Sequence, residues 1–327
     1  MLHSRRSWLA GSAALGLLAV LPASPAWAQA DYPNRPLRII VGFAPGGSND
    51  IVARLLAEKL HKSLGQPAIV ENKPGGGGAV AAAFVKSQPA DGYTLMVGAS
   101  GAMVVGPAIG APASYDTLAD FDPVSTLVTF PLVFFVNAES PHKSLKDFVA
   151  WSKANASSSN YGSASPTFTL AAELLKLRTG AMMQRVSYRG SNDAVVAVLG
   201  NQVTAAMTDP LPAIPLLKDG KLRALAVTSP NRLAELPDVP TMAEAGIAGA
   251  DAVFWTGLFA PKGTPKEIVS RLEAEVRNAM QDTELRQRLR ALATDASSSS
   301  PAGFVDRIKT ELKAWTDVAK AANVPLE

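Results

Sequence analysis

The chain has 327 residues, contains no cysteine and has a formal net charge of +3 at pH 7. The lack of cysteine excludes disulfides, a lipid on an N-terminal cysteine and thiolate metal sites. Since the net charge is small and no basic block occurs, nothing indicates binding to nucleic acid. The later apolar run at residues 130–136 has the length of a strand rather than of a membrane span.

Residues 1–28 have the pattern of a cleavable export signal. An arginine pair, Arg5 and Arg6, precedes a short apolar segment that ends in AWA at 26–28. We therefore expect cleavage after Ala28 and a periplasmic location, with the formal charge falling from +3 to +1 because both arginines are lost. The arginine pair fits a twin-arginine signal and also an ordinary Sec signal, so both export routes stay open.

The stretch at 37–64 predicts a strand, a glycine-rich turn and a helix. LRIIV at 37–41 is apolar and β-branched apart from Arg38, as in a strand buried on both faces of a parallel sheet. FAPGG follows at 43–47, and Ser48 or Asn49 then opens a helix with regularly spaced apolar residues. Such a turn directs backbone N–H groups and the positive end of the helix out of the sheet edge, where an anion would bind. A plain tight connection is the alternative, since neither nucleotide fingerprint is met.

Two further units of this kind follow in the first third of the chain. We predict strands at 68–72 and 93–97. KPGGGG at 73–78 is interpreted as a flexible loop at the rim of a cleft, because no Lys-Ser/Thr follows the glycines. GASG at 98–101 places the hydroxyl of Ser100 at a strand end.

The pattern restarts in the middle of the chain. Residues 124–137 predict two short strands around Pro131, which we interpret as a crossing into a second domain, with a hairpin as the alternative. Beyond this crossing, strands are predicted at 160–163, 184–187, 203–207 and 221–228, and helices at 145–154, 168–177 and 194–199. Three of these strands end in polar turns, which lie along one edge of a parallel sheet and form a second anion-binding edge. The strand at 254–260 is placed back in the first domain.

The mature sequence offers little catalytic chemistry. Its two histidines, His61 and His142, are expected at the surface, and GASG does not match G-x-S-x-G. No metal-ligand spacing occurs, and 6% aromatic residues are few for a sugar site. We expect no enzyme, no metal and no cofactor. Two α/β lobes joined by crossing strands instead indicate a hinged protein that closes on a small ligand.

Several ordered runs resemble the Bug family, the TctC-like periplasmic receptors of tripartite tricarboxylate transporters. They are YPNRPLRIIVGFAPGGSNDIVARLLAEKL, LGQPAIVENKPGGGG, ADGYTLMVG, NYGSAS, LRALAVTS, LPDVPTMAEAG and GLFAPKGTP. The resemblance covers essentially the whole mature chain. It implies a type II-like two-lobe α/β fold, with domain 1 at 29–125 and 250–327 and domain 2 at 126–249.

The resemblance also implies a function. The protein would capture a small carboxylate, either an organic acid, an acidic amino acid or an aromatic acid, and deliver it as a monomer to the membrane subunits of a transporter. Two other functions stay open: a ligand-sensing subunit that signals to a membrane histidine kinase, and a secreted hydrolase.

The implied ligand site draws on both domains. In the family, the first βα loop holds a ligand carboxylate, with waters bridging it to the strands. Carried over to this chain, the ligand-binding residues of domain 1 are Phe43, Ala44, Gly46, Gly47, Ser48, Asp50 and Ser100. Those of domain 2 are Ser163, Ser165, Thr167, Tyr188, Ser191 and Asp209. Asp50 is interpreted as ordering the loop, and Asp209 either as accepting from a ligand donor or as capping the next helix.

The chain departs from the family pattern at two places. Pro166 and Phe168 stand where related sequences have Gly- or Asn-rich residues, and Pro210 follows Asp209 in place of a polar residue. Since Pro166 lacks an N–H donor and Phe168 adds a ring, an apolar or aromatic acid gains weight.

Overall fold

The computed structural model describes residues 32–111, 113–188 and 190–322. The expected export signal and its cleavage site lie outside these residues. Residues 33–327 form one compact unit, to which the following description refers. Among the described residues, no helix combines the length and the apolar character needed to cross a membrane.

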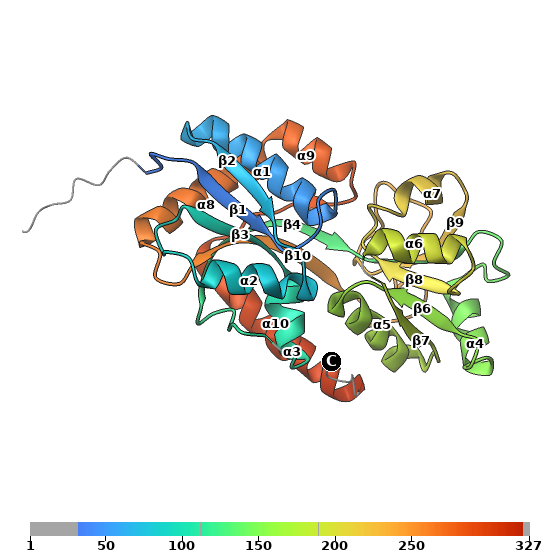
Figure 1. Cartoon of the computed structure of the whole chain (residues 1–327). Coiled ribbons are helices and arrows are strands. Elements are labelled where there is room, and N and C mark those ends of the chain that lie inside the picture. Colours follow the sequence, from blue (N-terminus) through green and yellow to red (C-terminus); the bar gives the residue numbers. More distant parts are fainter. Residues whose placement is uncertain (1–31, 112, 189, 323–327) are drawn as a thin grey trace, which may run out of the picture. The chain divides into compact units, whose positions relative to one another are not determined.

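A six-stranded sheet forms the first half of this unit (Figure 1). Its strands, in spatial order, are β11 (Asp295–Ala296), β4 (Phe121–Pro131), β10 (Val253–Pro261), β3 (Thr94–Ala99), β1 (Leu37–Val41) and β2 (Ala68–Asn72). β1 pairs in parallel with β2 and β3, as its largely apolar sequence predicted, whereas β10 runs antiparallel to β3 and β4.

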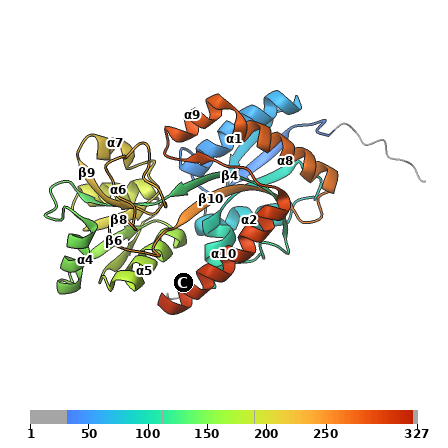
Figure 2. The same cartoon turned by 180° about the vertical axis from the view of Figure 1, so that it is seen from behind.

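Helices cover both faces of this sheet, and together with it they form what we call the first lobe. The helical elements are α1 (Ser48–Leu64), η1 (Gly76–Gly78), α2 (Ala79–Lys86), the π-helix η2 (Gly101–Val105), α3 (Gly106–Ala108), α8 (Lys266–Gln281), α9 (Thr283–Arg290) and α10 (Pro301–Ala322). Figures 1 and 2 show α1, α8 and α9 on one face and α2, α3 and α10 on the other. The aromatic side chains of Trp255, Phe259 and Phe304 fill the core on the α10 side.

A five-stranded sheet with its own helices forms the second lobe. The spatial order is β7 (Gln184–Ser187), β6 (Asn160–Ser163), β8 (Ala205–Thr208), β5 (Val133–Asn137) and β9 (Leu222–Val227). Its helices are α4 (Leu145–Ala154), α5 (Pro166–Thr179), α6 (Ser191–Leu199) and α7 (Ile214–Lys218). β6 pairs in parallel with β7 and β8, so the three polar turns do lie along one sheet edge, as predicted.

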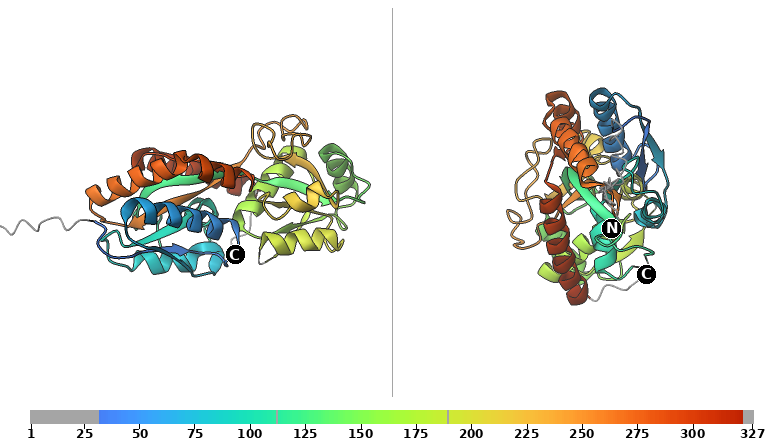
Figure 3. Two further views of the ribbon diagram at one scale, coloured as in Figure 1. Left: turned by 90° about the horizontal axis from the view of Figure 1, so that it is seen from above. Right: turned by 90° about the vertical axis from the view of Figure 1, so that its left-hand side faces the viewer.

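The chain crosses between the sheets twice. It leaves the first sheet after Pro131 at the end of β4 and returns to it with β10, which confirms the expected crossing strands. The buried Thr228 links the two crossings, because its Oγ1 accepts from the N–H of Leu132 (2.7 Å) and donates to the carbonyl of Ala252 (2.6 Å). The second lobe, green to yellow in Figure 3, is thus one uninterrupted insertion into the first. The domain limits at 125 and 250 stay a prediction.

α10 makes a further connection between the lobes. Its first half packs with Phe304 and Ile308 in the first lobe, while Ala319 near its end belongs to the core of the second. Trp315 lies between these two halves and stacks on Phe254 of β10, with 5.5 Å between the ring centroids. Among the described residues, the end of α10 thus connects the lobes in addition to the two crossings.

Candidate ligand-binding site

The first βα loop, residues 42–47, has the geometry expected of an anion site. Gly46 has a φ of +81°, which disfavours any side chain, and Gly47 is the N-cap of α1. The first helical hydrogen bond runs from Ile51 N–H to the Gly47 carbonyl at 3.0 Å. The amides of Ser48 and Asn49 precede that bond and lie at the positive end of a 17-residue helix.

Asp50 holds this loop in place. It is 2% exposed, and its Oδ2 accepts from the Gly46 N–H and from Arg54 Nε, both at 2.9 Å. Asn72 Nδ2 donates to the other oxygen at 2.9 Å. Burial raises the pKa of Asp50, but these hydrogen bonds and the charge of Arg54 outweigh it, so the net pKa lies below the ordinary value. The contacts agree with the interpretation of Asp50 as a residue that orders the loop.

Asn72, the last residue of β2, was not among the predicted site residues. Besides Asp50, its Nδ2 reaches the carbonyl of Phe43 at 2.9 Å, so it fixes both ends of the loop. The signal that could have found it is the pairing of β1 with β2, which places Asn72 beside Val41 at the start of the loop.

The end of β3 is tied to the neighbouring strand β10. Ser100 is 1% exposed, and its Oγ accepts from the Trp255 N–H at 3.3 Å. Next to it, Thr256 Oγ1 donates to Asn49 Oδ1 at 2.7 Å. Asn49 and Thr256 therefore join the polar edge of the first lobe, although the prediction included neither of them.

On the second lobe, two of the predicted hydroxyls form hydrogen bonds within their own loop and the start of α5. Ser163 Oγ lies 3.2 Å from the Ser165 carbonyl and 2.9 Å from Thr169 Oγ1. Ser165 is the N-cap of α5, and its Oγ accepts from the Phe168 N–H at 3.3 Å. The ring of Phe168 is 8% exposed and belongs to the core of the second lobe. It therefore adds no aromatic wall to the cleft, which removes one reason for expecting an aromatic acid.

Thr167 faces the first lobe. A Cβ built on Gly101 would lie 2.6 Å from Thr167 Oγ1, and one built on Gly77 would lie 3.7 Å from Pro166 Cδ. The start of α5 therefore touches the loops that follow β3 and β2. Tyr188 instead packs within its own lobe, since a Cβ on Gly162 would lie 3.2 Å from its ring.

Asp209 joins the two lobes. It is 8% exposed, its Oδ2 accepts from Ser48 Oγ at 2.8 Å, and its Oδ1 accepts from Ser191 Oγ. Burial raises the pKa of Asp209 above its ordinary value, and the two hydroxyl hydrogen bonds offset this only in part. The interpretation of Asp209 as a cap of the next helix is wrong, because α7 begins after Ala213 and has no side-chain cap.

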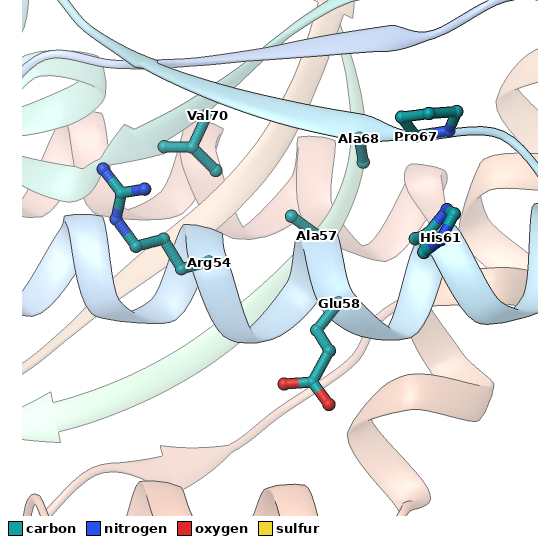
Figure 4. Close-up of a pocket in the computed structure, with 7 residues that line it drawn as sticks. All are labelled: Arg54, Ala57, Glu58, His61, Pro67, Ala68 and Val70. Atoms are coloured by element: carbon teal, nitrogen blue, oxygen red, sulfur yellow. The ribbon is translucent and has the colours of Figure 1, made fainter.

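A separate open groove of about 430 Å³ lies between α1 and β2 (Figure 4). It is lined by Arg54, Ala57, Glu58, His61, Pro67, Ala68 and Val70. None of the thirteen predicted ligand residues lines it, so it is not the candidate site. Within residues 32–111, 113–188 and 190–322, no group of three or more His, Asp or Glu side chains could hold a metal ion.

Residues 52–324 match the TctC family, described as the tripartite tricarboxylate transporter family receptor. The chain belongs to this family. Among relatives of this TctC receptor, a protein from the gbd 5′ region of Cupriavidus necator is 39% identical, over 88% of this chain and 86% of its own length. BugT of Bordetella pertussis is 34% identical, over 96% of this chain and 98% of its own. These findings confirm the resemblance seen in the sequence motifs.

Solved structures of similar proteins show the fold of this TctC receptor. An adipate-bound protein of R. palustris is 31% identical with a TM-score of 0.83, covering 91% of this chain and 100% of its own. MatC from Rhodopseudomonas palustris with bound malate is 32% identical with a TM-score of 0.81, covering 88% and 99%. The chain thus has the two-lobe α/β fold of periplasmic binding proteins, as predicted, and its family consists of receptors.

Proposed function

We propose that this TctC-family receptor binds a small carboxylate between its two lobes and delivers it to the membrane subunits of a tripartite transporter. The observation that carries the proposal is the hydrogen bond from Ser48 to Asp209. The N-terminus of α1 already holds a carboxylate oxygen at 2.8 Å, and that carboxylate is the chain's own. The same loop would hold a ligand carboxylate through the first amides of the helix, with Ser48 Oγ donating to the ligand in place of Asp209.

Several groups support this assignment by their position. Gly46, Gly47 and Ser48 form the turn into α1, and the hydrogen bonds of Asp50 to Gly46 and Asn72 keep this turn ordered. Thr167, at the start of α5, reaches toward the same region from the second lobe. One helix end contributes only about 0.3–1 kcal/mol, whereas micromolar affinity needs about 8 kcal/mol. Hydrogen bonds from both lobes and the exclusion of water on closure must supply the rest.

The proposed ligand class is an organic acid or an acidic amino acid. Two structures of 31% and 32% identity hold adipate and malate, which are both small dicarboxylates. An aromatic acid has less support, because the Phe168 ring lies in the core of the second lobe. We further propose that residues 1–28 are removed on export, that the mature protein acts as a monomer without a cofactor, and that it does not convert its ligand chemically.

A ligand panel tests the proposal. The chain from residue 29 onward would be purified from periplasm, examined by native mass spectrometry for a retained small molecule, and titrated calorimetrically with malate, adipate, glutamate and benzoate. Binding of at least one aliphatic acid at micromolar Kd, with the acid recovered unchanged, is the expected result. Failure of the whole panel, or conversion of an acid, would overturn the proposal.

A variant pair links that binding to the loop. Ser48→Ala removes the hydroxyl at the start of α1 and is expected to weaken acid binding about tenfold or more, the usual effect of losing a hydrogen bond to a charged group. Ser144→Ala is the matched control, because Ser144 caps α4 in the second lobe. Equal affinities of both variants would contradict the placement of the carboxylate at the first βα loop.

A further inference from the structure

Ser48 and Asp209 come from opposite lobes and are 161 residues apart in the sequence. We propose that their hydrogen bond is a latch, which holds the lobes together with the chain's own atoms and lets the receptor close before it binds a ligand. The inference goes beyond the proposed function and rests on it only in that the two lobes move relative to each other.

The surroundings of Asp209 explain why this bond would favour closure. Its carboxylate lies between the N-termini of α1 and α6, since Ser48 and Ser191 are the first residues of those helices. Each N-terminus attracts negative charge, and that of α1 belongs to the other lobe. Ser191 Oγ donates to the other oxygen of Asp209 from within the second lobe. Opening would remove the Ser48 hydroxyl and the positive end of α1 together.

Because Asp209 is buried, losing its hydrogen bond to Ser48 would cost free energy. Asp209 is 8% exposed and has a hydroxyl donor on each oxygen. A buried carboxylate that loses one of its donors must be solvated again, so the latch and the exclusion of water are coupled. The contact is therefore unlike an exposed surface ion pair, which contributes little to stability.

A second contact between the lobes, that of Gly101 with Thr167, does not involve the charge of Asp209. A Cβ on Gly101 would lie 2.6 Å from Thr167 Oγ1, a distance that real side chains essentially never show. The closed arrangement thus has no space for a Cβ at position 101 unless the hydroxyl of Thr167 moves. Because Thr167 Cβ would be 3.8 Å away, removing only the hydroxyl of Thr167 leaves room for an alanine there.

The absence of native cysteine allows a direct measurement of closure. Spin labels would be attached at Ile69→Cys on β2 and Val196→Cys on α6, whose native side chains are 49% and 63% exposed. Pulsed dipolar spectroscopy on the protein freed of ligand by unfolding, dialysis and refolding then gives the populations of short and long distances. No added ligand is needed, so the outcome does not depend on whether the carboxylate assignment is correct.

In this labelled background, Ser48→Ala and Asp209→Ala are each expected to lower the ratio of short to long distances by about tenfold. Ser191→Ala is the matched control, because it removes a hydroxyl from Asp209 within one lobe and keeps the bond to Ser48. Gly101→Ala is expected to open the protein, and the double variant Gly101→Ala, Thr167→Ala to restore the short distance.

Circular dichroism and thermal unfolding of every variant would show that it is folded. Two results would overturn the latch: unchanged distances in Ser48→Ala and Asp209→Ala, or an equal opening in Ser191→Ala. A ligand-free protein that shows only the long distance would overturn it as well. In contrast, a failed ligand panel combined with the expected distances would refute the carboxylate receptor and leave the latch standing.

Discussion

Two buried aspartates near the candidate site have opposite electrostatic surroundings. Asp50 receives hydrogen bonds from Arg54, Asn72 and a backbone N–H, and its pKa is lowered. Asp209 accepts hydrogen bonds from the hydroxyls of Ser48 and Ser191, and burial raises its pKa. The negative charge of Asp50 is therefore stabilised within the first lobe, whereas that of Asp209 is stabilised in part by Ser48 of the opposite lobe.

The first prediction concerns Asp50→Asn. Because the folded pKa of Asp50 lies below its unfolded value, its ionised form stabilises the protein fully above that unfolded pKa, and this contribution is lost as the pH falls through the folded pKa. Urea unfolding should show the variant about 1–3 kcal/mol less stable at neutral pH. The difference should shrink below about pH 4.

Asp317→Asn is the control for this pH series. Its ion pair with Lys313 is exposed on α10, so no measurable loss of stability is expected. A stability difference for Asp50→Asn that stays constant down to about pH 3 would show that the charge of Asp50 does not stabilise the loop.

The second prediction concerns Gly257→Ala in β10. An added Cβ would lie 2.3 Å from Phe304 Cζ and 3.2 Å from the Ser125 carbonyl, inside a close-packed core. Such overpacking should lower the free energy of unfolding by about 1–3 kcal/mol in urea. Gly200→Ala meets nothing closer than 3.5 Å and should be tolerated. Equal stabilities of the two variants would mean that α10 shifts without cost.

At the scale of elements, two helices of the second lobe begin in the same way. Ser144 caps α4 by accepting from the Asp147 N–H at 3.1 Å, and Ser165 caps α5 by accepting from the Phe168 N–H. Only α5 starts at the edge of the sheet where the lobes meet. A comparison of Ser144 with Ser165 can therefore distinguish a role in helix capping from a role in ligand binding.

The third prediction uses this pair. Ser144→Ala and Ser165→Ala should each lower the free energy of unfolding by about 1 kcal/mol, since each removes one N-cap. If Ser165 also contacts the ligand, only Ser165→Ala will raise the Kd for the acid found in the panel. An unchanged Kd would restrict Ser165 to its capping role and remove it from the ligand-binding residues.

Local sequence patterns predicted most elements, and their failures have physical reasons. The limits of β6 and β7 are those expected, because turn residues bound each of these short segments. α5 begins at Pro166 rather than at 168, since proline at the first helical position and a serine cap extend it. Asn72 and Thr256 were missed because their partners depend on strand pairing between distant segments.

The same limit applies to the candidate site. Sequence motifs placed Ser48 and Asp209 on the correct sheet edges, but their hydrogen bond depends on how the two edges face each other. No periodicity in the sequence contains that information. For the same reason the Phe168 ring was expected in the cleft, although the direction of α5 turns it into the core.

At the scale of the whole molecule, α10 makes the lobes interdependent. Trp315 stacks on Phe254 of the returning strand and packs against the cores of both lobes. The fourth prediction is that Trp315→Ala lowers the free energy of unfolding by about 2–4 kcal/mol, less than a fully buried tryptophan would. Urea unfolding followed by far-UV circular dichroism measures this loss. A change below about 1 kcal/mol would show that Trp315 contributes little to the coupling of the lobes.

The position of β10 determines when the first sheet can be completed during synthesis. This strand lies between β4 and β3 in the first sheet, yet it follows the entire second lobe in the sequence. A nascent chain that ends before Val253 lacks the strand that separates β3 from β4, so its first sheet cannot close. The strands of the insertion are all present before β10 emerges, whereas the first sheet stays incomplete until then. A polypeptide threaded through an export channel from its N-terminus would thus complete the central part of its first sheet only after Pro261 had passed.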